Sequence, residues 1–329
     1  MEQKKMPFFQ CRHITMKKGG FTLSDINFSL PSGYILGVIG RNGSGKTTLL
    51  RTLLGSYRLV PPYGGKSKNF SENAVFQASG DILLNNISIR KDAAGYKQQT
   101  AFVLNNTPFS LYMSAKDCER IYRKYYRDFN REKYFDCLNT FQVPISSPIG
   151  KMSKGEQIKQ QLAFALSYPA KLYILDEPAA NLDTEFREMF YQNLRTLTAD
   201  GTKSIVYVSH LVDDLEYLAD YILWIGTETR KDSEKTGIQR YFGSMEDLRE
   251  EFQLVEADSK EAAEIRRESV VGIWKRENHQ EMLVQLQRNE LPKHLKRISR
   301  YASLKEIMYY TEKGDGENET ALFGIMDRK

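Results

Sequence analysis

Apolar residues in the first part of the chain form short continuous runs, which are separated by turns and by helical patterns. Four of these runs indicate strands buried on both faces: YILGVIG (34–40), KLYILDEP (171–178), KSIVYVSH (203–210) and YILWIG (221–226). Helical patterns stand between them at 47–55, 114–141, 153–167 and about 184–198. Strands that alternate with helices in this way predict an α/β domain on a largely parallel sheet.

The pattern changes toward the C-terminus. After Leu254 the chain turns to short strands around charged helices, with strands expected at 268–278 and 281–287 and a terminal helix at 302–314. We therefore expect a main domain at 1–254 and a small α+β accessory domain at 255–329. Within the main domain, the turn-rich stretch 61–79 predicts a loop or insertion, and strands are expected at 80–89 and 100–104.

Composition narrows the class of protein. A hydrophobic content of 41% in 329 residues excludes a disordered or low-complexity chain. No run approaches the roughly 20 apolar residues that cross a bilayer, and the N-terminus lacks the apolar core of a signal peptide. A protein of this kind that serves a membrane is expected to be a peripheral subunit. Cys11, Cys118 and Cys137 form no CxxC pair, which argues against a zinc site or disulfide framework and fits a reducing cytoplasm.

The net charge of +5 lies entirely in residues 1–254. Residues 255–329 are neutral, because they hold 14 basic and 14 acidic side chains. So mild a balance does not by itself indicate a nucleic-acid partner.

The segment GRNGSGKT (40–47) matches the phosphate-binding pattern G-x-x-x-x-G-K-[ST] between a predicted strand and a predicted helix. Gly40, Gly43 and Gly45 would let backbone N–H groups curl around phosphate oxygens, with Asn42 and Ser44 between them. Lys46 would contact the β- and γ-phosphates, Thr47 would ligate Mg²⁺, and Thr48 would bond the α-phosphate. The alternative for this segment is an ordinary glycine turn.

A second candidate site follows the buried strand LYILDE (172–177). Asp176 would hold Mg²⁺, usually through water, and Glu177 would orient or deprotonate the attacking water. Solvated acids at the end of a strand are the alternative.

Three further segments complete a family pattern: MSKGEQ (152–157), AANLD (179–183) and SH (209–210). With the two sites above, and in this order, they resemble the signature, D-loop and switch histidine of ATP-binding cassette (ABC) ATPases. The resemblance covers about residues 6–250. It implies a P-loop fold with a mixed, mostly parallel sheet, an antiparallel β subdomain and a helical subdomain at about 106–165.

The resemblance also implies a head-to-tail dimer with ATP between the protomers. Lys46, Thr47, Asp176, Glu177 and His210 would act from one chain, and His210 would sense the γ-phosphate. Ser153 and the backbone of Gly155 would reach the same nucleotide from the other chain. Asp183 would couple the two sites. Its alternative is a helix N-cap, and both roles could hold. The alternative for His210 is a purely structural histidine.

Three positions depart from the family pattern. Asn105, or Asn106 if the loop is shifted, stands where the Q-loop glutamine is expected, so its contact with Mg²⁺ or water is expected to change. Lys18 occupies the place of the aromatic residue that stacks on adenine, with Phe21 as the nearest substitute. Lys154 replaces a signature glycine.

Residues 119–133 mix basic and aromatic side chains, and Arg120, Lys124, Arg127 and Arg131 are expected on one helical face. In the family this segment lies in the helical subdomain, where the membrane subunit docks. A solvated face and a nucleic-acid surface are the alternatives.

The C-terminal layout loosely resembles ATPases of bacitracin-resistance and multidrug exporters, whereas a dimer-stabilising extension explains it equally well. Its basic run could face lipid headgroups or simply be a solvated loop; the run comprises Lys293, Lys296, Arg297, Arg300 and Lys305.

Together these features predict an ATP-binding, ATP-hydrolysing subunit of a bacterial ABC exporter on the inner face of the cell membrane. Its cofactors would be ATP and Mg²⁺, and its partners a separate transmembrane permease and a second cassette, either identical or paralogous. Two alternatives stay open: a soluble ABC ATPase that acts on ribosomes or DNA, and a regulatory cassette that only binds ATP.

Overall fold

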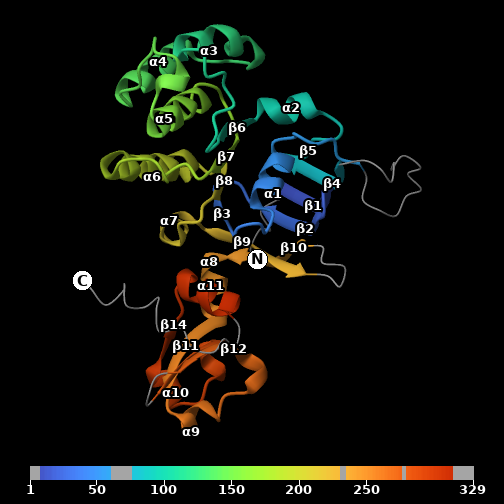
Figure 1. The fold of residues 1–329 in the computed structure, drawn as a ribbon, viewed down its shortest axis with the longest axis vertical. Helices are drawn as coiled ribbons and strands as arrows, with labels where there is room; N and C mark the ends of the chain where they lie inside the picture. The colour runs from blue at the N-terminus through green and yellow to red at the C-terminus, as the bar shows by residue number, and fades with distance from the viewer. Residues whose placement is uncertain (1–7, 61–75, 230–234, 276–278, 314–329) are drawn as a thin grey trace. The chain divides into compact units, whose positions relative to one another are not determined.

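The computed structural model describes residues 8–60, 76–229, 235–275 and 279–313. The chain divides into two compact units, Met1–Phe242 and Gly243–Lys329 (Figure 1). The second unit thus begins before the expected boundary at 254, which falls inside strand β11 (Phe252–Ala257). That strand cannot be divided between units, because it pairs with strands on both sides in the second unit.

In the described part of the first unit, strands gather into one sheet. Their bounds are β1 (Phe9–Lys18), β2 (Phe21–Leu30), β3 (Ile35–Ile39), β4 (Phe76–Leu84), β5 (Ile87–Ser88), β6 (Thr100–Val103), β7 (Leu172–Asp176), β8 (Ser204–Val208), β9 (Tyr221–Thr229) and β10 (Lys235–Ser244). The order across the sheet is β5-β4-β1-β2-β10-β9-β3-β8-β7-β6.

This sheet has a parallel part and an antiparallel part, as predicted. Strands β6, β7, β8, β3 and β9 pair parallel with one another in that order, whereas β1 pairs antiparallel with both β2 and β4. All five residues of β3 and of β8 are buried, which explains why their sequences are continuously apolar. Because parallel strands end at the same edge of a sheet, the segments after β6, β7, β8 and β3 lie beside one another.

Helices pack around this sheet and fill the segments between its strands (Figure 1). In the first unit they are α1 (Lys46–Leu53), α2 (Ala93–Gln98), α6 (Thr184–Ala199) and α7 (Val212–Leu218). The predicted loop at 61–79 is partly wrong: residues 76–79 belong to β4, where they pair with the end of β1. Residues 61–75 lie outside the described part.

A helical region at one end of the first unit holds α3 (Ala115–Tyr122), the 3₁₀ helices η1 (Arg123–Tyr125) and η2 (Ile149–Lys151), α4 (Arg131–Thr140) and α5 (Lys154–Ala165). The expectation of continuous helix over 114–141 is wrong, because the chain leaves the helix after η1 and Asn130 caps a new one by accepting from the Lys133 N–H. The region is packed by aromatic rings. Phe164 lies 5.0–5.8 Å, between ring centroids, from Phe109, Tyr126, Phe129 and Tyr134.

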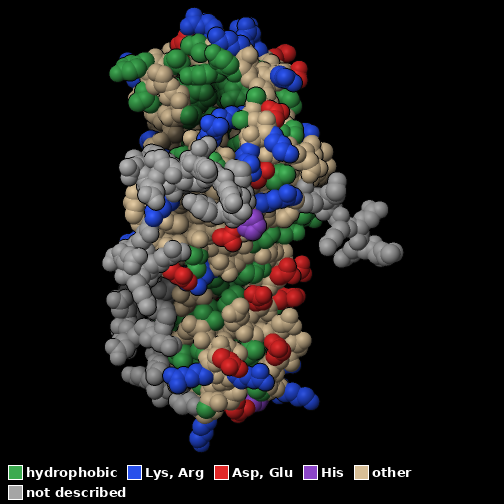
Figure 2. All heavy atoms as spheres, turned by 90° about the vertical axis from the view of Figure 1, so that its right-hand side faces the viewer, with side chains coloured by type: hydrophobic (Ala, Val, Ile, Leu, Met, Phe, Trp, Pro, Cys, Tyr) green, Lys and Arg blue, Asp and Glu red, His purple; other side chains and the backbone are tan. Residues whose placement is uncertain are grey.

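Because the helix is broken, the four basic residues expected on one helical face do not share a helix. Arg131 turns back toward α3, where it lies 3.4 Å from a carboxylate oxygen of buried Glu119. Arg123 reaches the same oxygen at 3.3 Å, and Arg120 pairs with Asp117 at 2.9 Å. Basic side chains at this end of the first unit therefore stand among acidic and hydrophobic ones (Figure 2).

In the described part of the second unit, an antiparallel sheet has the order β12-β13-β11-β14, which confirms the small α+β extension. The other strands are β12 (Val270–Lys275), β13 (Gln280–Gln285) and β14 (Ser299–Tyr301), and the helices are α8 (Met245–Glu251), α9 (Ser259–Ala262), α10 (Leu295–Ile298) and α11 (Leu304–Lys313). Val255, Met282 and Leu295 belong to its core. The predicted basic run is partly neutralised here, since Arg300 pairs with Glu306.

Candidate functional site

The loop between β3 and α1, residues 40–45, bends around a small backbone cradle, which we call the phosphate loop together with Lys46 and Thr47. Gly40, Gly43 and Gly45 have φ angles of +151°, +83° and +106°, which favour glycine. A Cβ atom on Gly40 would lie 2.3 Å from the Ile225 carbonyl oxygen, so no larger residue fits there. The cradle opens onto the N-terminus of α1, where unpaired N–H groups attract anions.

Lys46 is folded back across this loop. Its Nζ atom donates to the Gly40 carbonyl at 2.5 Å and to the Arg41 carbonyl at 3.2 Å, and the residue is buried. Asn42, Gly43 and Thr47 are exposed, Thr48 is half-buried, and the buried Ser44 hydroxyl has no hydrogen-bond partner in the described structure. A cradle that side chains would fill, a fixed ammonium and an unsatisfied hydroxyl fit the phosphates of a nucleotide.

Two acids follow at the end of β7, on the strand next but one to β3. Burial, and then repulsion from the Glu177 carboxylate, raise the pKa of Asp176, while the positive charge of Lys46 opposes that rise. Glu177 has a left-handed φ of +50°, and its N–H donates to the Val208 carbonyl of β8 at 2.9 Å. The structure thus brings Asp176 and Glu177 to the same sheet edge as Lys46, with Glu177 in a strained conformation typical of functional sites.

His210 lies directly against Glu177. Its backbone N–H donates to Glu177 Oε1 at 3.0 Å, and its ring Nδ1 is 2.7 Å from Oε2. The Glu177 side chain is 14% exposed and that of His210 58%, so the carboxylate is shielded from one side by the imidazole. This pairing brings the candidate base into direct contact with the expected switch histidine.

Oxygen ligands for Mg²⁺ are few in the described residues. They contain no group of three or more His, Cys, Asp or Glu side chains that could hold a metal ion. A Mg²⁺ ion next to Thr47 and Asp176 would therefore complete its octahedron with phosphate oxygens and water, as this ion commonly does.

Asn105 and Asn106 come two and three residues after β6 and are both exposed. The preceding residue, Leu104, is bonded through its N–H and its carbonyl to the side chain of Gln161 on α5. The predicted Q-loop position therefore lies at the acid-bearing sheet edge, because β6 neighbours β7.

The signature residues lie elsewhere, beside the D-loop. Ser153 caps α5 in a reciprocal capping box with Glu156, and Lys154 begins the helix as an exposed residue. A Cβ on Gly155 would be 2.8 Å from the carbonyl oxygen of Asn181. Ser153 and Gly155 thus present a helix N-terminus next to the D-loop segment.

Asp183 is the N-cap of α6. It accepts a hydrogen bond from the Phe186 N–H, which together with Lys159 at 3.3 Å holds the pKa of the carboxyl below its usual value. The capping role proposed for this residue is present, and it leaves the second carboxylate oxygen facing Lys159.

Phe21 occupies a hollow under the phosphate loop. Its ring tip would be 2.8 Å from a Cβ on Gly45 and 3.1 Å from one on Gly237. The ring therefore occupies space that side chains at these two glycine positions would need. Lys18 stands across the β1–β2 turn, paired with Phe21 in the sheet. The ring thus supports the loop, and an adenine contact by Phe21 stays a prediction.

Gly237 on β10 is a position that the sequence motifs did not include. A Cβ there would lie 2.2 Å from the carbonyl oxygen of Ser44 in the phosphate loop. An isolated glycine within a strand marks a close backbone approach, and that signal was present in the sequence. Gln161, by contrast, lies in an ordinary helical stretch and has no comparable signal.

Replacing Asp176 by asparagine should raise the melting temperature of the nucleotide-free protein by about 1–3 °C and abolish Mg²⁺-dependent ATP hydrolysis. A pKa raised on folding means that the ionised carboxylate is less favourable in the native state than in the unfolded chain. This penalty is fully present above the folded-state pKa, and so at neutral pH, and it is lost as the pH falls through the folded-state pKa toward the unfolded-state value.

Asp183→Asn is the control, because its pKa is lowered on folding and its loss should lower the melting temperature. Thermal unfolding at pH 7 checks both variants. A melting temperature of Asp176→Asn below that of the unmodified chain would contradict the assignment of a buried charge.

Comparison with known proteins shows which family this chain resembles in sequence. The profile described as "ABC transporter" matches residues 23–180. AlbC of Bacillus subtilis (strain 168), which carries the name of an ABC transporter ATP-binding protein, is 30% identical over 219 residues, or 63% of this chain and 82% of AlbC. The ABC transporter ATP-binding protein YtrB of the same organism is 27% identical over 236 residues, or 71% of this chain and 70% of YtrB.

Relatives with import functions in their names occur as well. The galactose/methyl galactoside import ATP-binding protein MglA of Haemophilus influenzae (strain Rd) is 30% identical over 217 residues, covering 64% of this chain and 41% of MglA. Among solved structures, the ATP-binding cassette MJ0796, a dimer bound to ADP and Pi after hydrolysis, superimposes with a TM-score of 0.56 at 18% identity. The superposition covers 72% of this chain and 98% of the MJ0796 chain. This last likeness concerns the fold.

Proposed function

This chain belongs to the ABC transporter family, as an ATP-binding ATPase, and we propose that it powers export through a separate transmembrane permease. Among the described residues, no helix is both long and apolar enough to cross a membrane. The observation that carries the proposal is the meeting of Lys46, Asp176, Glu177 and His210 at one edge of a parallel sheet.

In the proposed mechanism, the phosphate loop binds the β- and γ-phosphates of ATP through its backbone N–H groups and Lys46. To reach them, the Lys46 ammonium exchanges its bonds to the Gly40 and Arg41 carbonyls for phosphate oxygens. Thr47 and Asp176 would hold Mg²⁺, which would supply positive charge to offset that of the phosphate oxygens. The phosphate loop thus fixes the substrate next to the two acids.

Glu177 then acts as the base toward water. His210 contacts both carboxylate oxygens and so fixes the orientation of the side chain at the sheet edge where the γ-phosphate would lie. The carboxylate accepts a proton from the attacking water, and His210 moves between Glu177 and the γ-phosphate as the nucleotide state changes. Ser153 and Gly155 of a second cassette, identical or paralogous, close the site from the opposite side in a head-to-tail dimer.

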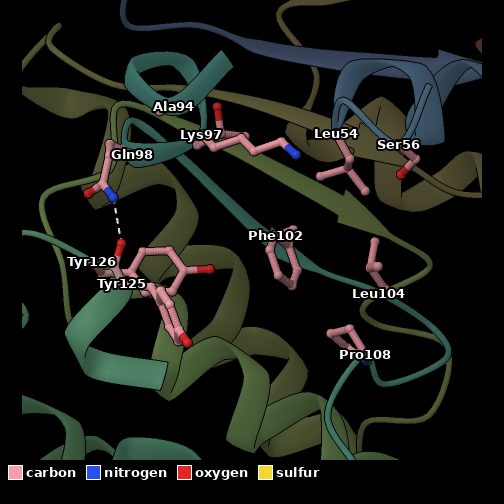
Figure 3. Close-up of a pocket in the computed structure, with 11 residues that line it drawn as sticks. Leu54, Ser56, Ala94, Lys97, Gln98, Phe102, Leu104, Pro108, Tyr125 and Tyr126 are labelled. Carbon is pink, nitrogen blue, oxygen red and sulfur yellow. Dashed lines mark hydrogen bonds between the residues drawn. The ribbon is translucent and has the colours of Figure 1, made fainter. Parts of the chain in front are cut away.

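A cavity in the first unit offers the permease a docking place. It has a volume of about 480 Å³ and a mainly apolar lining. The lining comes from α2, β6, η1 and the residues that follow α1, β6 and η1, and it includes Leu54, Lys97, Phe102, Leu104, Tyr125 and Tyr126 (Figure 3). Exposed Tyr125 stands at its rim, and exposed Leu111 and Tyr112 belong to the same helical region. Such an apolar groove suits one face of an amphipathic helix from the permease.

Export is the finer part of the proposal. It rests on the loose resemblance of the C-terminal layout to that of bacitracin-resistance and multidrug exporter ATPases, and the second unit gives this layout as a small antiparallel sheet with the terminal helix α11. Because import proteins also occur among the relatives, the direction needs a transport assay: ATP-dependent efflux from cells that express the chain with its permease is the expected result.

A pull-down from solubilised membranes should recover a multi-span membrane protein with the full-length chain. Tyr125→Ser should weaken this recovery severalfold, because it removes an apolar ring at the docking cavity. Tyr217→Ser is the matched control, since Tyr217 is 63% exposed, against 61% for Tyr125, but lies on α7. Recovery of ribosomes in place of a membrane protein would refute the transporter assignment, and equal recovery by the two variants would refute the docking place.

A further inference from the structure

Gln161 makes an unusual pair of contacts across the first unit. Its Oε1 atom accepts from the Leu104 N–H at 2.9 Å, and its Nε2 atom donates to the Leu104 carbonyl at 3.0 Å. The residue is only 1% exposed. One side-chain amide thus satisfies both backbone groups of a single residue, in the manner of a strand neighbour.

Leu104 depends on this contact for its position. The pairing of β6 with β7 ends at Val103, so Leu104 is the first residue beyond the sheet. Buried backbone groups are nearly always hydrogen-bonded, and here the partner is a helix side chain in place of a strand. Any displacement of α5 therefore displaces Leu104 and the Asn105 that follows it.

The N-terminal end of the same helix carries the signature residues. Ser153 caps α5, and Gly155 in its first turn packs on the Asn181 carbonyl of the D-loop. Lys159, two residues before Gln161, lies 3.3 Å from Asp183. A rigid helix of 12 residues therefore connects the segment expected to meet nucleotide with the contact to Leu104.

Leu104 also lines the docking cavity, as do Phe102 and Pro108 (Figure 3). On another wall, Gln98 of α2 makes a second paired contact, donating to the Tyr125 carbonyl and accepting from the Arg127 N–H. Two side-chain amides therefore connect the helical region with the rest of the first unit. Gln161 does so through Leu104, and Gln98 does so through Tyr125 and Arg127.

We propose that Gln161 is a positioning residue that relays movement of the signature helix to Leu104, and so couples ATP binding to the shape of the docking cavity. The inference rests on the proposed function, because it requires that the start of α5 engages nucleotide. It assigns to Gln161 a role in coupling that the motifs do not include.

The test compares Gln161→Met with Gln160→Met in the full-length chain. Methionine keeps the length of glutamine and loses both hydrogen bonds. Gln160 is the matched control, because it is also buried on α5 but bonds the Tyr134 hydroxyl and not Leu104. The readouts are ATP affinity, kcat and KM for ATP, and hydrogen exchange of the segment 104–110 with and without ATP.

In the unmodified chain and in Gln160→Met, ATP should slow exchange of the segment 104–110. In Gln161→Met this effect of ATP should disappear, and kcat should fall roughly 2- to 30-fold while KM changes less than twofold. If Gln161→Met does not fold, Gln161→Glu replaces it; it keeps the acceptor for the Leu104 N–H, loses the donor, and should lose part of the ATP effect.

Two outcomes are distinguished by this design. Normal hydrolysis in the unmodified chain, with the same ATP-dependent exchange in the Gln161 and Gln160 variants, would overturn the relay and leave the proposed function standing. Absence of ATP binding and hydrolysis in the unmodified chain would overturn the proposed function itself, and the relay with it.

Discussion

Replacing Glu177 by glutamine is expected to lower ATP turnover by roughly 10²–10⁴-fold while ATP binding is retained. The amide keeps the size of the side chain and an oxygen that can accept from the His210 N–H, now 3.0 Å from Oε1. It cannot accept a proton from water at neutral pH, so only the chemical step is removed. ATP should therefore accumulate in the closed dimer.

Two measurements check this expectation. Steady-state ATPase assays report the loss of turnover, and light scattering with ATP reports the trapped dimer. Glu188→Gln, which makes the same change of charge at an exposed position of α6, should leave both unchanged. Continued turnover in Glu177→Gln would show that another group is the base.

Replacing Gly237 by alanine should weaken ATP binding by about 10- to 100-fold and lower stability by about 1–3 kcal/mol. The new methyl group would lie 2.2 Å from the Ser44 carbonyl and 3.1 Å from the Leu23 and Phe21 side chains. Backbone cannot yield as a flexible side chain can, so the phosphate loop must move. Its N–H groups would then no longer converge on the phosphates.

Gly226→Ala on the neighbouring strand β9 is the matched control. A methyl group there would meet only the Arg240 side chain among its nearest atoms, at 2.6 Å from Cγ, and that side chain can rotate away. We expect an ATP dissociation constant within about twofold of the unmodified value, by isothermal titration, and a small change in melting temperature. Equal effects of the two substitutions would refute the support of the phosphate loop by β10.

The sequence was most informative where a short segment carries its own chemistry. The phosphate loop and the acids at 176–177 were predicted because backbone freedom and charge are local properties, and the signature segment was identified by its resemblance to the family pattern. The buried strands were equally plain, since a strand covered on both faces must be apolar at every position.

The failures lie where one segment depends on another. The stretch 114–141 has helical residues throughout, yet the chain breaks after η1, where the backbone of Arg127 bonds Gln98 and Arg131 pairs with Glu119. The start of β4 at Phe76 was missed for the same reason, since those residues form a strand by pairing with β1. Neither partner is close in sequence.

By itself, then, the sequence determined the chemistry that this ATPase offers to a nucleotide and the alternation of strands and helices that presents it. Tertiary structure alone decided that Phe21 supports the phosphate loop, that the backbone lying close to Gly237 is that of Ser44, and that Gln161 holds Leu104. The physical reason is that periodicity tells which face of an element is buried, while its partner, and the closeness of their backbones, depend on strand order and register between distant segments.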